Sequence, residues 1–365
     1  MSLVLRAGLT LLAALGAALL CGWLNTPIPW MIGPLLATAA LTVAGAPTAS
    51  LGPLRDAGQW VIGAALGLYF TPQMTALVAG LWWAIALAVL WSLLIGFGFS
   101  AWLYRRFASQ MPEIAPPTMR ATTYFAGAIG GASEMTLLAE RVGARTDLVA
   151  AAHSLRLLIV VVVIPFAMVW AKGWWGLQAI ELAPSGPRPV VGTGLLALAA
   201  ATGAGGWLLR RAGRANPWFM GALLVAMGLT MAGVEWSAMP TALSNAAQLV
   251  IGVSLGVRFS PAFLRTAPRW LAAVAAGTLV LMGLCAGFGV TLAWATGLHP
   301  ATLILGTSPG GITEMAITAK VLQLGVPVVT ALQVCRLVAV LLLVQPCYRL
   351  LDRRGFWSEN SRNHS

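Results

Sequence analysis

The sequence predicts an all-α polytopic membrane protein made of two inverted structural repeats, each with about five transmembrane helices plus a re-entrant or broken helix. Three observations predict this class. Of the 365 residues, 59% are hydrophobic and only 9% are charged, which is more apolar surface than a soluble core needs. A motif of the form Gly-Gly-x-Ser/Thr-Glu-Met occurs twice in apolar sequence. The arginines lie in short loops between apolar segments, where cytoplasmic placement explains them.

Twelve apolar segments follow one another along the chain, and most are long enough to cross a hydrocarbon core of about 30 Å as helices. The first six are residues 3–22, 28–46, 57–71, 77–104, 121–140 and 148–171, and the second six are residues 192–209, 217–234, 243–259, 268–296, 301–320 and 327–350. The segment at 3–22 lacks the small-x-small cleavage site of a signal peptide, so we expect a retained helix.

The two sets of six match in order, which indicates a tandem duplication. Pro29-Trp30 recurs as Pro217-Trp218. The third and ninth segments share a GxxxG match, Gly63 to Gly67 and Gly252 to Gly256, for which close packing between helices is the expected role. We divide the chain into a first membrane repeat (1–171), an inter-repeat loop (172–190), a second membrane repeat (191–351) and a polar C-terminal tail (352–365).

The positive charges predict how the repeats are oriented. If all twelve segments crossed the bilayer, the loop arginines of the second half, such as Arg210 and Arg258, would lie outside. If the motif-bearing segments 121–140 and 301–320 enter and leave on the same side, each half has five crossings and nearly every loop arginine faces the cytoplasm. Five crossings invert the second half, and both termini of this multi-pass protein then lie on the cytoplasmic side of the bacterial inner membrane. A crossing broken helix, combined with another segment that does not span, also fits the charges.

Glycines explain why the motif-bearing segments would break. Gly130-Gly131 and Pro309-Gly310-Gly311 favour local unwinding of a helix within the membrane. Broken backbone at that depth is tolerated only where it is buried in protein or lines a wet cavity, and its free polar groups then form a site. We expect the two motifs to meet at such a site.

Each motif places a hydroxyl and a carboxylate beside the break, Ser133-Glu134 in the first half and Thr313-Glu314 in the second. The functional interpretation is that the glutamates bind a coupling proton or cation, while the hydroxyls and free backbone groups hold the substrate. The structural alternative is that each glutamate neutralises the arginine that follows 22 positions later in its own half, as a buried pair.

These two arginines, Arg156 and Arg336, lie about two turns into their helices. A guanidinium there could receive an anionic substrate group through two parallel hydrogen bonds, and snorkelling or pairing with glutamate is the alternative. His153 lies one turn before Arg156, with Gln333 as its counterpart; a packed or hydrogen-bonded histidine is expected, and a proton relay with Glu134 is the functional alternative. The candidate substrate- or ion-binding residues are Gly130, Gly131, Ser133, Glu134, His153, Arg156, Gly310, Gly311, Thr313, Glu314, Gln333 and Arg336.

Other kinds of site are not expected. The four cysteines have no CxxC spacing and the histidines number only three, so we expect no disulfide, no conventional metal site and no cofactor. No Walker-type Gly-Lys-Ser/Thr sequence is present, which argues against an ATP-driven pump. The net charge of +12 comes from loop arginines, so direct binding of nucleic acid is not expected.

The doubled motif, GGASEM and PGGITEM, together with the PWMIGPLL segment and the GxxxG helix that follows, resembles the bacterial AbrB-type membrane protein family, which is built from an internal membrane duplication. The resemblance covers about residues 10–350. It implies a fold similar to that of the cation–proton antiporter and anion transporter group. Members carry the labels ammonia monooxygenase and regulator of gene expression. Three scattered histidines do not supply a typical ligand set for copper or iron oxygen chemistry, and a regulator of this composition would act indirectly.

We therefore expect a secondary active transporter of a small solute, with an anion as one candidate, coupled to a proton or cation through the two motifs. The protein is not expected to be an enzyme. The alternative is a membrane-embedded regulator or sensor that affects gene expression indirectly, and a membrane oxidase or monooxygenase ranks third. The expected partners are a small-molecule solute, a proton or sodium ion and the lipid bilayer, and a homo-oligomer is compatible with the sequence.

Overall fold

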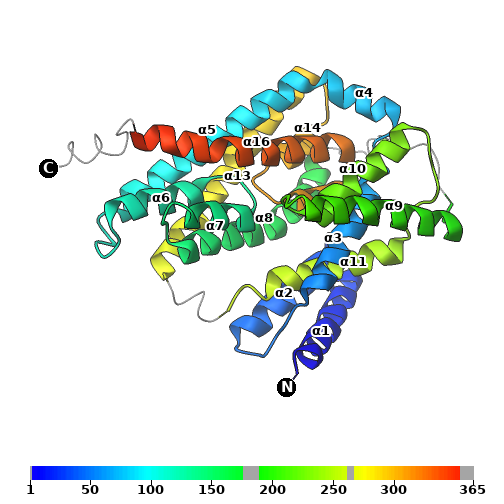
Figure 1. Cartoon of the computed structure of the whole chain (residues 1–365), viewed down its shortest axis with the longest axis horizontal. Coiled ribbons are helices and arrows are strands. Elements are labelled where there is room, and N and C mark those ends of the chain that lie inside the picture. The colour runs from blue at the N-terminus through cyan, green and yellow to red at the C-terminus, as the bar shows by residue number, and fades with distance from the viewer. Residues whose placement is uncertain (1, 176–188, 261–266, 354–365) are drawn as a thin grey trace.

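The computed structural model describes residues 2–175, 189–260 and 267–353, and over these residues the chain is helical with no strand (Figure 1). The first half contains α1 (Leu3–Trp23), α2 (Pro29–Val43), α3 (Gly52–Gly67), α4 (Pro72–Gly80), α5 (Trp82–Phe107), α6 (Pro116–Gly127), α7 (Ala132–Glu140) and α8 (Thr146–Trp175). The second half contains α9 (Gly192–Arg211), α10 (Pro217–Met231), α11 (Thr241–Gly256), α13 (Pro268–Thr296), α14 (Pro300–Thr307), α15 (Ile312–Val321) and α16 (Val326–Arg353). The predicted all-α class is confirmed.

Six of these helices, α1, α5, α8, α9, α13 and α16, are long and apolar enough to cross a membrane. Helices α3 and α4 pass the same test together but bend by 88° at the break between them, and α2, α10 and α11 are shorter apolar helices. Residues 77–80, which the sequence assigned to the fourth segment, belong to α4, because the helix is interrupted at Leu81 before α5 begins. The chain is a polytopic helical membrane protein.

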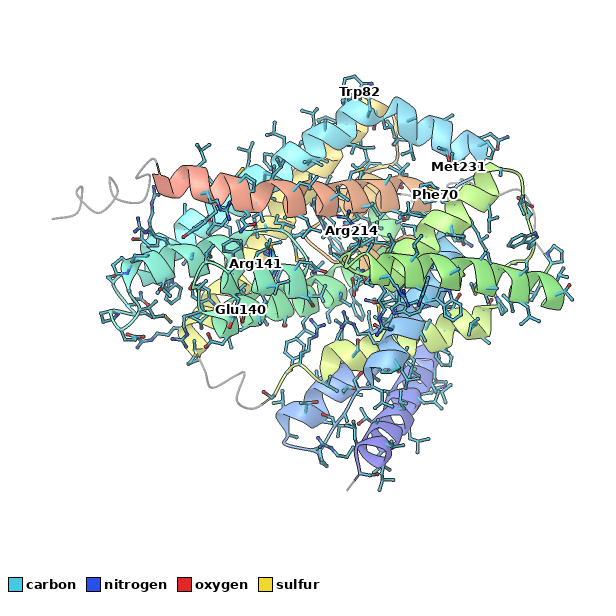
Figure 2. The ribbon with its side chains drawn as sticks, viewed as in Figure 1. Phe70, Trp82, Glu140, Arg141, Arg214 and Met231 are labelled. Atoms are coloured by element: carbon cyan, nitrogen blue, oxygen red, sulfur yellow. The ribbon has the colours of Figure 1, made fainter. Side chains whose placement is uncertain are left out.

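The outer surface is apolar, as a bilayer requires. Leu19 on α1, Leu94 on α5 and Val280 on α13 are all exposed. Trp82 and Trp294, at the ends of α5 and α13, are exposed by 70% and 81%, and Trp82 lies at the edge of the molecule (Figure 2). Tryptophan at the end of an apolar helix is typical of an interfacial anchor.

Each half packs on the other through equivalent helices. Helix α2 packs on α11 while its counterpart α10 packs on α3, and α8 packs on α13 while its counterpart α16 packs on α5. The GxxxG glycines lie at these contacts: a Cβ added to Gly67 would be 2.7 Å from the carbonyl oxygen of Leu223, and one added to Gly256 would be 2.8 Å from that of Leu35. Only glycine allows the backbones to approach so closely, which confirms the packing role predicted for these glycines.

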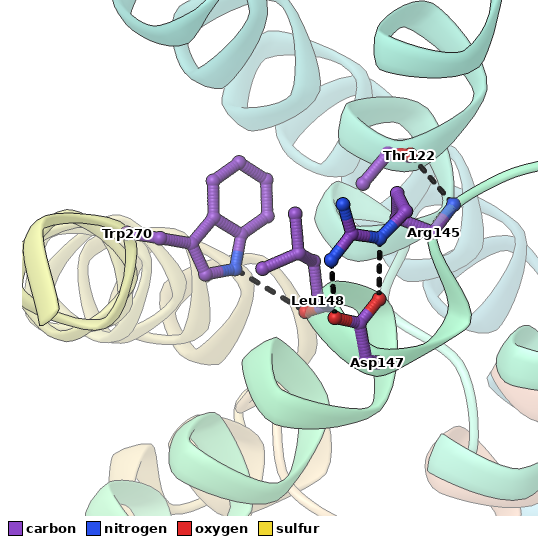
Figure 3. Close-up of polar contacts among 5 residues, drawn as sticks. All are labelled: Thr122, Arg145, Asp147, Leu148 and Trp270. Carbon is purple, nitrogen blue, oxygen red and sulfur yellow. Dashed lines mark hydrogen bonds and ion pairs between the residues drawn. The ribbon is translucent and has the colours of Figure 1, made fainter. Parts of the chain in front are cut away.

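Both motif-bearing segments are helical hairpins. The Arg145 amide, which follows α7, donates to the Oγ1 atom of Thr122 in the middle of α6 (3.0 Å), as Figure 3 shows. In the other half, the Gly325 amide donates in the same way to the Oγ1 atom of Thr302 in α14 (3.2 Å). If α7 continued in the direction of α6, Arg145 would lie more than about 20 Å beyond the break, at a rise of 1.5 Å per residue. Each segment therefore turns back at its break, which excludes the crossing broken helix.

The start of α8 is fixed from two further directions (Figure 3). Arg145 forms an ion pair with Asp147 (2.7 Å), and the Trp270 indole of α13 donates to the Leu148 carbonyl (3.2 Å). Helix α8 also joins two hydrophobic cores, because Val160 packs with the buried residues of α2, α3, α10 and α11, whereas Val149 packs with those of α5, α6 and α13. The first hairpin and the helix that follows it are thus held in the centre of the molecule.

Candidate functional site

The tips of the two hairpins meet at one cavity of about 390 Å³. Eleven of the twelve residues that the sequence singled out line it, and Gln333 is the one that does not. The lining residues among them are Gly130, Gly131, Ser133, Glu134, His153, Arg156, Gly310, Gly311, Thr313, Glu314 and Arg336. The duplicated motifs therefore form one common site, and the binding roles of these residues remain predictions.

The glycines of the motif make room for side chains of the motif itself. A Cβ on Gly131 would collide with the Glu134 carboxylate, and one on Gly311 would collide with the Glu314 carboxylate in the same way. The sequence predicted that the backbone unwinds at these glycines, and both segments do break here, but the backbone angles of Gly131 and Gly311 do not themselves require glycine. Their φ angles of −68° and −77° belong to extended backbone that any residue can adopt. The requirement is one of space.

The first glycine of each pair has a separate partner. A Cβ on Gly130 would be 2.8 Å from Cε of Met135, and one on Gly310 would be 2.9 Å from Cγ of Met315. Packing around the break thus explains both glycines of the motif: the first accommodates the methionine, and the second accommodates the glutamate.

The glutamates lie in the first turn of the helices that begin at the break. Glu134 is in the first turn of α7 and Glu314 in that of α15, and neither helix has a side-chain cap at its N-terminus. The first amides of a helix have no partner within the helix and carry the positive end of its dipole. The cavity therefore receives two helix N-termini, each with a carboxylate beside it.

The arginines bind the helices that end at the break. Arg156 donates to the carbonyls of Ala126 (3.4 Å) and Ala128 (2.8 Å) at the end of α6. Arg336 donates to the carbonyls of Ser308 (2.5 Å) and Gly310 (2.7 Å) at the end of α14. These are carbonyls that a helix end leaves without a partner, and a guanidinium also suits the negative end of the dipole. Each arginine caps its own hairpin.

This arrangement decides between the alternatives for the glutamates. Over the described part of the chain, neither Glu134 nor Glu314 forms an ion pair with Arg156 or Arg336. The buried Glu–Arg pair suggested by the shared spacing is not formed, because the hairpin brings the carbonyls of the break to each arginine instead. The glutamates are left facing the cavity.

His153 and Gln333 perform the same task with different chemistry. The Gln333 amide nitrogen donates to the Leu305 carbonyl (2.8 Å), and its oxygen accepts from Arg336 (2.5 Å). The Nε2 atom of His153 lies 2.9 Å from the Phe125 carbonyl, and its Nδ1 atom lies 2.6 Å from Nη2 of Arg156. Since the arginine can only donate, Nδ1 accepts and the proton is on Nε2. Both nitrogens of a neutral imidazole are used, so the structure favours the hydrogen-bonded role over a relay with Glu134.

The two tips differ in their exposure. Thr313 and Glu314 are only 4% and 7% exposed, whereas Ser133 is exposed and Glu134 is partly exposed. Among the described residues, neither the Thr313 hydroxyl nor the Glu314 carboxylate has a hydrogen-bond partner on another side chain. A buried carboxylate that forms no ion pair is costly, and such groups in membrane proteins are typical of solute or ion sites.

Sequence reasoning missed the other half of the polar lining. The additional residues are Arg55, Asp56, Arg210, Asn216, Ser254 and Arg258. Arg55 corresponds to Ser244 in the second repeat, and Arg258 corresponds to Tyr69 in the first. A comparison of repeats finds only what both halves share, so it passes over these arginines. Gln59 also lines the cavity.

No group of three or more His, Cys, Asp or Glu side chains that could hold a metal ion occurs within the ranges that the structure describes. The cavity instead offers carboxylates, hydroxyls, helix N-termini and guanidinium groups. This set of donors and acceptors is suited to binding a small polar solute.

Comparison with known proteins shows which family and which relatives this chain is similar to. A family model described as "Transition state regulatory protein AbrB" matches residues 30–352. The "Uncharacterized protein YhjN" of Bacillus subtilis (strain 168) is 28% identical over 355 residues, which cover 89% of this chain and 87% of that protein. A protein of Escherichia coli (strain K12) named "Putative regulator AbrB" is 27% identical over 340 residues, which cover 91% of this chain and 93% of that protein. No solved structure matches the chain significantly.

Proposed function

This chain belongs to the AbrB family, and on that basis we propose that it is a secondary transporter of a small solute across the bacterial inner membrane. The observation that supports transport most strongly is the meeting of two hairpin tips, one from each repeat, at a single cavity. In secondary transporters built from inverted repeats, the substrate and coupling ion bind at the interface of the repeats, beside interrupted helices. The carboxylates of Glu134 and Glu314 are the proposed carriers of the coupling charge.

A proton is the coupling ion that the site favours. A sodium site at a broken helix uses backbone carbonyls as ligands. Here the carbonyls of Ala128 and Gly310 already accept from Arg156 and Arg336. The guanidinium groups thus occupy the carbonyls that a bound cation would use as ligands. The two glutamates remain as titratable groups that face the solute.

The alternative is a sensor that binds a solute and signals without moving it. It draws support from the name of the E. coli relative, "Putative regulator AbrB". A sensor of this kind would use the same cavity. Binding data alone therefore do not separate the two functions, whereas movement of solute does.

The test is a transport screen in proteoliposomes that contain a pH-sensitive dye, with a pH gradient or a sodium gradient imposed. We expect at least one small solute to move protons, and Glu134→Gln or Glu314→Gln to abolish this movement because the isostere keeps its shape but loses the titratable charge. Glu113→Gln, at an exposed position outside the cavity, is the matched control. Full activity in both cavity variants contradicts coupling through the glutamates, and solutes that bind but never move support the sensor.

A further inference from the structure

Two arginines from opposite halves face the cavity without a partner. Arg55 lies in the first turn of α3, and Arg258 follows the end of α11. Both line the cavity and both are partly buried. Neither guanidinium forms a hydrogen bond or ion pair with any residue in the described ranges. Arg156 and Arg336, by contrast, donate to the carbonyls of the helix breaks.

Their surroundings make this arrangement costly in the absence of an anion. Burial lowers the pKa of Arg258, as does the neighbouring charge of Arg55, while the charges of Glu314 and Glu134 raise it. Two like charges facing one partly dehydrated space repel each other, and a guanidinium binds oxyanions well through parallel hydrogen bonds. Five arginines and three acidic residues line the cavity, so positive charge is in excess.

Part of the wall is apolar and the space is large. The apolar lining includes Ile129, Leu157, Trp218, Ile251, Leu255 and Leu337. A cavity of about 390 Å³ lies in the range of sites that hold small organic molecules and is much larger than an inorganic oxyanion needs.

We propose that Arg55 and Arg258 bind the oxyanion of a small organic acid, whose apolar body lies against Trp218 and the neighbouring aliphatic side chains. The assignment rests on the proposed transport function and names its substrate class. It also explains why each of these two positions carries an arginine in only one of the repeats, since a single oxyanion does not need a second, symmetry-related pair. A carboxylate, a sulfonate and a phosphate group share this chemistry.

The test measures binding to the purified full-length protein in detergent, by titration calorimetry and by the fluorescence of its tryptophans. The probes are benzoate, succinate, methanesulfonate and inorganic phosphate, with benzamide as the neutral match to benzoate. We expect at least one organic acid to bind and benzamide not to bind. Arg258→Gln and Arg55→Gln should weaken binding by about 10- to 100-fold, because each removes a charge-assisted hydrogen bond. Arg258→Lys should keep part of the affinity, and Arg349→Gln, at an exposed position of α16, should keep all of it.

Two outcomes overturn the anion site: no organic acid binds, or the Arg55 and Arg258 variants bind as the unmodified protein does. Binding of phosphate alone, without any organic acid, also overturns the proposed substrate class. The result is separable from the transport proposal. Arginine-dependent binding without solute movement under any gradient overturns transport and keeps the site, whereas coupled transport that is indifferent to both arginines overturns the site alone.

A separate contact ties one hairpin to a neighbouring helix of its own repeat. The Nζ atom of Lys320, in the last turn of α15, donates to the Oγ atom of Ser244 in α11 (3.1 Å). In the duplicated sequence, the counterpart of Lys320 in the first hairpin is Glu140, and the counterpart of Ser244 is Arg55. Glu140 lies at the exposed end of α7 (Figure 2), and it forms no ion pair with Arg55 in this structure. The end of the second hairpin is therefore tied to a helix of its own repeat, and the equivalent tie in the first repeat is not formed.

We infer that the two pairs close the cavity alternately: Lys320 with Ser244 in the state described, and Glu140 with Arg55 in the state that faces the other side of the membrane. Inverted repeats exchange conformations when a transporter changes its direction of access, so a contact formed by one repeat is formed next by its equivalent. Opposite charges make Glu140–Arg55 suited to such a contact, and the ion pair would take Arg55 away from a bound anion. This inference also rests on the transport proposal.

The test is cross-linking in membranes, in a variant without native cysteines. Lys320→Cys with Ser244→Cys should form a disulfide readily, and Glu140→Cys with Arg55→Cys should form one during exchange, while Glu113→Cys with Arg55→Cys should not. Prior cross-linking of the first pair should prevent cross-linking of the second when all four cysteines are present. If Glu140→Cys and Arg55→Cys never cross-link, or if both pairs cross-link in the same molecule, the alternating closure is wrong.

Discussion

The Glu314 carboxylate fills the space that a Cβ atom on Gly311 would occupy, and Glu134 and Gly131 repeat this arrangement in the other half. The position of each carboxylate in the cavity therefore depends on the absence of a side chain three residues earlier. The relationship connects a structural glycine directly to the group proposed to carry the coupling charge.

Replacement of either glycine by alanine should displace the carboxylate. We expect Gly131→Ala and Gly311→Ala to lose most of their transport activity. Their free energy of unfolding should fall by about 1–3 kcal/mol, the typical cost of overpacking. The measurements are flux in proteoliposomes and chemical denaturation in detergent. Gly98→Ala and Gly283→Ala, where an added Cβ meets nothing within 4 Å, are the controls.

A double variant identifies the cause. If the collision with the carboxylate is responsible, Gly131→Ala combined with Glu134→Ala should recover stability but not transport. Unchanged flux in both single alanine variants would show that the carboxylates do not need this position.

His153 should be replaceable by the residue that stands at its equivalent position. In His153→Gln, the amide can donate to the Phe125 carbonyl and accept from Arg156, as Gln333 does for Leu305 and Arg336. We expect a change in unfolding free energy below about 1 kcal/mol, against a loss of about 1–3 kcal/mol in His153→Leu, which leaves both partners unsatisfied. The check is denaturation of both variants side by side.

The same variant tests whether the histidine relays protons. Because both ring nitrogens are engaged, His153→Gln should leave the dependence of flux on pH unchanged. If the flux through this variant no longer rises or falls with pH where that of the unmodified protein does, the proton relay between His153 and Glu134 is supported instead.

Because Arg156 and Arg336 cap the hairpins, removing either guanidinium should lower the free energy of unfolding, and a change at the glutamates should not reverse this loss. Arg156→Met and Arg336→Met should each lower the free energy of unfolding by about 2–5 kcal/mol, since two break carbonyls lose their donor. The exposed Arg349→Met is the control. Adding Glu134→Gln to Arg156→Met should bring no recovery. Recovery in that double variant would indicate that the two charges interact after all.

The sequence predicted the common site because a duplication shows every shared position twice, and the loop arginines favoured the hairpins while a crossing broken helix also fitted them. Glu134 and Glu314, or Arg156 and Arg336, could be found in this way. What each arginine binds could not, because a spacing of 22 residues does not tell which part of a hairpin faces the next helix. Arg55 and Arg258 could not be found either, because their equivalents Ser244 and Tyr69 carry no charge. Symmetry in the sequence thus predicts the residues that both repeats contribute to the site. The charged residues that only one repeat contributes are known only from the fold.

The inverted topology predicts where reporter fusions are found. Fusions at Ser50, Arg106 and Arg211 should report the cytoplasm, and one at Pro184, which lies outside the described residues, should report the periplasm. The measurement is a pair of reporters, one active on each side of the membrane. A cytoplasmic signal at Pro184 would instead support parallel repeats.

Cysteines at the two hairpin tips should differ in reactivity, although the sequence alone predicts that both are reached by water. Ser133 is exposed whereas Thr313 is 4% exposed, so an aqueous thiol reagent can reach only the first tip in this state. We expect Ser133→Cys to react at least about tenfold faster than Thr313→Cys, which corresponds to an opening free energy of ~1.4 kcal/mol or more for the second tip. Substitution of Lys320 by alanine removes its bond to Ser244 and should speed the reaction of Thr313→Cys while leaving that of Ser133→Cys unchanged. The measurement is the rate of labelling by a membrane-impermeant maleimide in vesicles of known orientation. Equal rates at the two tips would mean that the cavity is open to water at both hairpins, and a Thr313→Cys rate that is indifferent to Lys320 would mean that this lysine does not close it.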